Sequence, residues 1–96
     1  MKTIIKDRRT EEQAETLTVG VIGYDDFMSD WGPAEGRASY ACWACSSGDA
    51  DRVARWVRAR KDLRDVRRVN LDTFKPSPEG VHVSIYPVTS GHPATL

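Results

Sequence analysis

The sequence predicts a small α+β domain in which one helix packs on one face of a single antiparallel sheet of four to five strands. The chain has 96 residues, which suffices for one hydrophobic core, so residues 1–96 are expected to form a single domain. Four segments have the composition or the alternating pattern of strands, and one segment between them repeats apolar residues at helical spacing. The expected order is therefore strand, strand, helix, strand, strand.

The first two expected strands are apolar on both faces, which is typical of strands in the interior of a sheet. Residues 16–24 read TLTVGVIGY and residues 39–45 read SYACWAC. Between them, residues 25–31 are expected to form one helical turn, and Gly32-Pro33 then begins an irregular loop.

The helix is expected over residues 49–62, where Val53, Trp56 and Val57 recur on one helical face. Residues 46–49 (SSGD) precede it and supply capping hydroxyls and an acidic residue for its first turn. This segment has the clearest helical signal in the chain.

The last two strands are expected to be half-buried, because apolar and polar residues alternate over 68–73 and over 81–86. Residues 63–66 are expected to turn the chain from the helix into the first of them. The connection at 75–80 is polar and contains proline and glycine, which predicts an antiparallel hairpin between these strands.

The two ends of the chain carry weaker signals. Residues 1–15 are expected to form an edge strand, over 2–8, or a flexible arm, and residues 88–96 a flexible tail. Neither a secretory signal nor the roughly 18 apolar residues of a membrane span is found in the sequence. We therefore expect a cytoplasmic protein whose two cysteines are reduced thiols.

The formal net charge is zero, but the charges are distributed unevenly. Residues 1–48 contain five Lys and Arg against eight Asp and Glu, a net charge of −3, whereas residues 49–96 contain nine against six, a net charge of +3. This asymmetry can orient the encounter with a charged partner or with a second copy of the chain.

Alternation along the strands predicts a second, aromatic face of the sheet, away from the helix. The helix-side face is expected to contain Val19, Val21, Trp43, Val69, Leu71, Val81, Val83 and Ile85. The opposite face is expected to contain Ile22, Cys42, Asp72 and Ser84 and to offer a binding surface formed by Tyr24, Tyr40, Arg68, Asn70, His82 and Tyr86. Tyrosine suits binding surfaces because its ring is large and its hydroxyl tolerates water. Alternatively, the amino-terminal segment and the loop at 25–37 cover this face and make it ordinary core.

A basic segment follows the helix start: residues 52–68 contain eight Lys and Arg but only Asp62 and Asp65. Its helical arginines, Arg52, Arg55 and Arg58, are candidate contacts for phosphates or for an acidic partner. The competing interpretation is a solvated helix face, since Asp51 and Asp62 lie four residues from Arg55 and Arg58, at ion-pair spacing.

Other motifs predict little chemistry. The thiols of Cys42-x-x-Cys45 are expected to diverge, because residues three apart in a strand face opposite sides. The gap between His82 and His92 matches no common zinc spacing. Asp25 and Asp26 follow a strand end, where a metal-dependent nuclease would place carboxylates, but helix capping and loop solubility are the preferred explanation, because the sequence offers no second acidic cluster and no base. We therefore predict no catalytic residue, no metal and no cofactor.

Three functions remain open at this stage. The leading hypothesis is a non-enzymatic binding module that docks its aromatic face and basic helix onto a protein, as a regulator, inhibitor or assembly adaptor, or onto a second copy of itself. The first alternative is binding of single-stranded nucleic acid or RNA through the same face. The second alternative is the metal-dependent nuclease.

Overall fold

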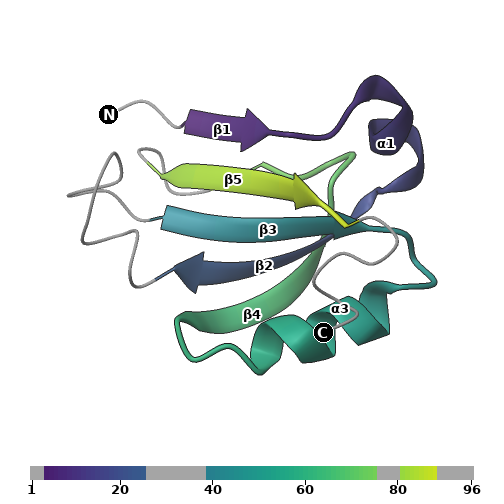
Figure 1. Ribbon diagram of the computed structural model, residues 1–96. Coiled ribbons are helices and arrows are strands. Elements are labelled where there is room, and N and C mark those ends of the chain that lie inside the picture. Colours follow the sequence, from purple (N-terminus) through teal and green to yellow (C-terminus); the bar gives the residue numbers. More distant parts are fainter. Residues whose placement is uncertain (1–3, 26–38, 76–80, 89–96) are drawn as a thin grey trace.

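The computed structural model describes residues 4–25, 39–75 and 81–88, and within these ranges it contains one five-stranded sheet and two helices (Figure 1). The elements are β1 (Ile4–Asp7), α1 (Glu11–Thr16), β2 (Val19–Asp25), β3 (Ser39–Cys45), α3 (Ala50–Arg58), β4 (Leu63–Asn70) and β5 (His82–Pro87). The strand order across the sheet is β1-β5-β3-β2-β4. The expected α+β class is confirmed, and so is the extra amino-terminal strand.

The sheet is mixed rather than wholly antiparallel. β2 pairs antiparallel with β3 and β4, whereas β5 pairs parallel with β3 and β1. The predicted hairpin between the last two strands is wrong, because β4 lies at one edge and β5 lies between β1 and β3 (Figure 1). β4 and β5 run in the same direction, and strands that run in the same direction are joined by a crossover connection and not by a tight turn. The polar composition of the connection indicated a loop but not which strands it joins.

Helix α3 packs on one face of the sheet, here called the helix-side face, and forms a core chiefly with residues of β3. Its buried members are Val21, Ala41, Trp43, Cys45, Ala50, Val53, Ala54, Val57, Leu63 and Val88. The helix ends at Arg58, earlier than expected. The turn predicted at 63–66 is wrong, because β4 already begins at Leu63, whose side chain is buried beside the helix.

The opposite face, here called the second face, carries its own apolar core. Its buried members are Ile22, Cys42, Ala44, Val81, Val83 and Ile85, and Leu17, Tyr40, Val69, Leu71 and Phe74 pack against them. Val69, Leu71, Val81, Val83 and Ile85 were expected under the helix, so five of the eight helix-side assignments are wrong. The reason is that two apolar layers sandwich this sheet, whereas the prediction assigned every apolar strand residue to a single layer.

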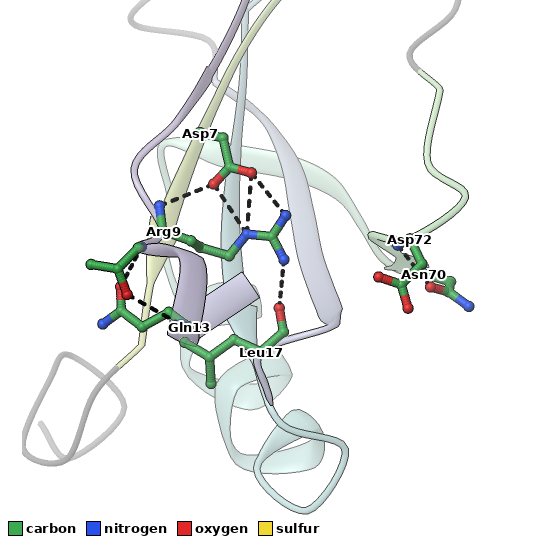
Figure 2. Close-up of polar contacts among 7 residues, drawn as sticks. Asp7, Arg9, Gln13, Leu17, Asn70 and Asp72 are labelled. Carbon is green, nitrogen blue, oxygen red and sulfur yellow. Dashed lines mark hydrogen bonds and ion pairs between the residues drawn. The ribbon is translucent and has the colours of Figure 1, made fainter. Parts of the chain in front are cut away.

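The segment between β1 and β2 helps to bury the second face, because Leu17 packs on its core. Thr10 caps α1 with a capping box, because its hydroxyl accepts from the Gln13 backbone and the Gln13 side chain accepts from the Thr10 backbone. Arg9 holds this segment in place: its guanidinium binds both carboxylate oxygens of Asp7 and donates to the Leu17 carbonyl at 2.8 Å (Figure 2). The alternative of an amino-terminal segment that packs on the second face is therefore supported at Leu17.

The Asp7–Arg9 pair makes a testable contribution to stability. The side-chain hydrogen bonds from Arg9 hold the pKa of Asp7 below its ordinary value. A depressed pKa stabilises the folded state above the ordinary aspartate pKa of about 3.9, and the contribution is lost as pH falls through the lower, folded-state pKa. Asp7→Asn is expected to lower the free energy of unfolding at pH 7 by about 1 kcal/mol or less, since the Asp7 side chain is 37% exposed.

The check is urea unfolding of both proteins from pH 7 down to about pH 2.5. The difference in unfolding free energy between wild type and Asp7→Asn should shrink as pH falls below about 3.9. Because other carboxylates titrate equally in both proteins, the difference isolates Asp7. A difference that stays constant with pH would show that the ion pair contributes nothing.

The chain end that follows β5 is described only at its first residue, Val88. Of the expected tail at 88–96, only Val88 lies in the described ranges; it is buried, and its backbone N–H donates to the Ala44 carbonyl at 2.8 Å.

Neither helix in the described residues has the length and the apolar composition that crossing a membrane requires.

Candidate binding site

A β-bulge in β4 lies beside Tyr24 and Tyr40 at one end of the second face. The pairing of β4 with β2 shifts by one residue between Tyr24↔Arg64 and Ile22↔Arg67, so β4 contains one extra residue there. Asp65 occupies the bulge with φ of 55°, a left-handed conformation that aspartate adopts more readily than most residues. In a regular strand Arg64 and Arg67 would face opposite sides of the sheet. The bulge places both on the second face.

The two arginines flank a pair of tyrosines. Tyr24 and Tyr40 are direct cross-strand partners on β2 and β3, and their rings meet edge to face with centroids 5.4 Å apart. The Arg64 guanidinium lies over the Tyr24 ring, with its Cζ atom 4.4 Å from the ring centroid. We call Tyr24, Tyr40, Arg64 and Arg67 the tyrosine–arginine cluster. Both rings are half-buried, and both arginines are exposed.

A pocket of about 270 Å³ opens beside this cluster, lined among the described residues by Ile22, Tyr40, Asp65 and Arg67. It combines an aliphatic side chain, an aromatic ring, a carboxylate and a guanidinium within one concavity. Within the described part of the chain, neither Asp65 nor Arg67 forms an ion pair. Both charges thus remain available to a ligand that offers complementary polar groups.

The predicted aromatic surface is therefore only partly assembled. Tyr24 and Tyr40 lie together on the second face as expected, but four other predicted members lie on the helix-side face. These are Arg68, Asn70, His82 and Tyr86.

The contacts and pairings of these four residues explain the correction. Arg68 forms an ion pair with Asp51 of α3, and Tyr86 packs on Trp43 with ring centroids 5.9 Å apart. Asn70 is paired with Val19, which packs on the helix-side core. His82 alternates with Val81 and Val83 of the second face and is buried, being 5% exposed. The predicted alternation holds in both strands, but Val69 of β4 and Val83 of β5 lie in the second apolar layer, so their polar neighbours lie on the helix-side face.

The basic helix expected from the sequence is α3, and it packs beside β4, the edge strand that carries Arg64 and Arg67. Arg52, Arg55 and Arg58 are exposed on α3, which lies beside β4 in Figure 1. The ion pairs expected within the helix are replaced by others: Arg52 pairs with Asp49, and Asp51 pairs with Arg68 of β4. Asp62 pairs with Arg60. The positive charges of α3 and β4 therefore line one edge of the sheet on both of its faces.

Both cysteines are free thiols buried in the two apolar cores. Cys42 belongs to the core of the second face and Cys45 to the core of the helix-side face, which confirms that their side chains diverge. Burial raises the pKa of Cys42 to about 12 and that of Cys45 to about 11. Both thiols therefore stay protonated and unreactive at neutral pH.

Metal ligands do not gather in the part of the chain that the structure describes: it contains no group of three or more His, Cys, Asp and Glu side chains suited to a metal ion. Asp25 ends β2. Asp26, His92 and the rest of the helical turn expected at 25–31 lie outside the described residues.

Three residues of the site were missed from the sequence: Arg64, Asp65 and Arg67. Arg64 and Asp65 fell in a segment expected to be a turn, and Arg67 was assigned to no face. A signal was present, because Leu63 and Val66 are apolar and three residues apart, and a strand can bury both on one face only with a bulge between them.

Comparison with known proteins adds no function to this geometry. The chain matches no protein-family model, no curated protein and no solved structure.

Proposed function

We propose that this protein is a non-enzymatic binding protein that holds single-stranded nucleic acid at the tyrosine–arginine cluster. The observation that carries the proposal is the Arg64 guanidinium over the Tyr24 ring, beside a second tyrosine and a pocket that contains Arg67. Single-strand binders combine aromatic rings on which bases stack with cationic groups that follow the phosphates. Here both components are present on one face of one sheet.

The proposal differs from the protein docking expected first because the aromatic surface is smaller than the sequence predicted. An extended docking face needs several buried anchors, but only Tyr24 and Tyr40 of the predicted set remain on the second face. What remains is compact, aromatic and cationic. The exposed arginines of α3 and β4 extend the positive charge beyond the pocket and supply further phosphate contacts.

Arg67→Ala is expected to weaken binding of a fluorescent oligothymidylate of about 12 nucleotides, measured by fluorescence anisotropy over a range of salt concentrations. Arg67 is exposed, so the fold should be unaffected. If Arg67 contacts one phosphate, the slope of log K against log salt should become shallower by about 0.7.

Lys6→Ala is the matched control, because it removes one positive charge from β1, at the opposite edge of the sheet. It should leave both affinity and salt slope unchanged. The proposal fails if wild type does not bind the oligonucleotide at low salt. It also fails if inorganic polyphosphate competes as well as the oligonucleotide, since charge alone would then account for binding.

A second candidate is docking onto a second copy of the chain, through the edge strand β1 and not through the aromatic face and basic helix expected from the sequence. The observation that favours it is on β1, where Ile4 and Ile5 are 38% and 48% exposed. β1 is an edge strand, and an edge strand with exposed apolar side chains readily pairs with another strand. Light scattering would detect the dimer, and Ile5→Lys should dissociate it. A monomer at high protein concentration rules this candidate out.

A further inference from the structure

Asp65 is unexpected in a surface built to hold anions. It lies between Arg64 and Arg67 in the chain and lines the same pocket as Arg67. Its left-handed backbone explains why a residue such as glycine, asparagine or aspartate occupies the bulge. The backbone does not explain why this residue carries a negative charge, which repels phosphate.

A carboxylate in a base-binding pocket is an acceptor for N–H groups. The Watson–Crick edge of guanine presents two adjacent donors, N1–H and the 2-amino group, which match the two oxygens of one carboxylate. Cytosine and adenine present one amino group beside an acceptor nitrogen, and thymine and uracil present one N–H between two carbonyl oxygens. Single-stranded bases expose these edges, and proteins read them by hydrogen bonds while stacking the ring.

We infer that Asp65 reads guanine: the base lies in the pocket against Tyr40, and the Asp65 carboxylate accepts from guanine N1–H and the 2-amino group. This inference rests on the proposed function and adds a base preference to it. A base fits the pocket by size, since about 270 Å³ is just below the range of pockets for drug-sized molecules. A well-formed pair of hydrogen bonds discriminates between bases by about tenfold or more.

The experiment compares oligothymidylates of about 12 nucleotides that carry one central guanine, hypoxanthine, cytosine or adenine, or thymine throughout. Hypoxanthine lacks only the 2-amino group of guanine. Wild type should bind the guanine strand about tenfold more tightly than each of the others, measured by fluorescence anisotropy.

Asp65→Asn should reduce the preference for guanine to about twofold or less, while the all-thymine strand binds as well as before or better, since a negative charge is removed. Asparagine also tolerates the left-handed backbone, so the bulge should be kept. Asp62→Asn is the matched control: it removes the same charge from outside the pocket and should retain the preference.

The outcomes separate the inference from the proposed function. Equal binding of all strands by wild type overturns the guanine assignment but leaves single-strand binding in place. Equal binding of the guanine and hypoxanthine strands, or a preference that survives Asp65→Asn, overturns the role of Asp65. Failure to bind any strand at low salt overturns both.

Discussion

Trp43→Ala is expected to lower the free energy of unfolding by about 3–5 kcal/mol, the range for removal of a large buried aromatic side chain. Trp43 is 5% exposed and lies at the centre of the helix-side core. Its ring meets Trp56 edge to face at a centroid distance of 5.2 Å, and the Arg60 guanidinium lies 5.2 Å from its centroid. A loss of this size removes a large part of the stability of a small domain.

The measurement is chemical unfolding followed by circular dichroism, which avoids dependence on tryptophan fluorescence. Trp56→Ala is the comparison, because Trp56 is in the same cluster but only partly buried. It should cost less than Trp43→Ala. If the two variants lose equal stability, or if Trp43→Ala loses less than about 1 kcal/mol, Trp43 is not the centre of the core.

Gly20→Ala is expected to cost about 1–3 kcal/mol, because overpacking a filled core forces its neighbours to move. A Cβ atom on Gly20 would lie 2.7 Å from the Cys42 sulfur and 2.9 Å from side-chain carbons of Val69 and Leu71. Cys42 is a buried member of the core of the second face, and Val69 and Leu71 pack against that core. The melting temperature should fall by about 4–8 °C for each kcal/mol lost.

Gly48→Ala is the matched control for this substitution. A Cβ atom there meets only the Ser46 hydroxyl oxygen, at 4.0 Å, so stability should change by no more than about 0.5 kcal/mol. Gly20→Ala with the stability of wild type would mean that the second face is loosely packed. That result would contradict the well-packed apolar core described on the second face.

Local features of this fold were predictable from the sequence, whereas the arrangement of the strands was not. The segment SYACWAC forms β3 with the expected bounds, and α3 begins directly after Asp49, close to the expected start, although the expected side-chain cap is absent at Asp49. Both signals depend on neighbouring residues. The position of β5 between β1 and β3 depends on pairings between distant segments, which periodicity does not encode.

In the site, too, the features that depend on local alternation were predictable, and those that depend on strand pairing were not. Tyr24 and Tyr40 were predicted to share a face and do so, because each lies in a strand of regular alternation. For Arg68, the alternation with Val69 holds, but Val69 packs in the second apolar layer and not under the helix, so Arg68 lies on the helix side. The bulge at Asp65 inserts one residue into β4 and places Arg64 and Arg67 on the face of the tyrosines. One local irregularity thus determines which charged groups surround the pocket.

The most direct test of single-strand binding at the tyrosine–arginine cluster is a ¹H–¹⁵N NMR titration with an oligothymidylate of about 12 nucleotides. The resonances of Tyr24, Tyr40, Arg64 and Arg67 should shift together and saturate, while the resonance of Lys6 on the opposite edge strand stays in place. An unchanged spectrum, or shifts confined to β1 or to the exposed side of α3, would contradict binding at this cluster.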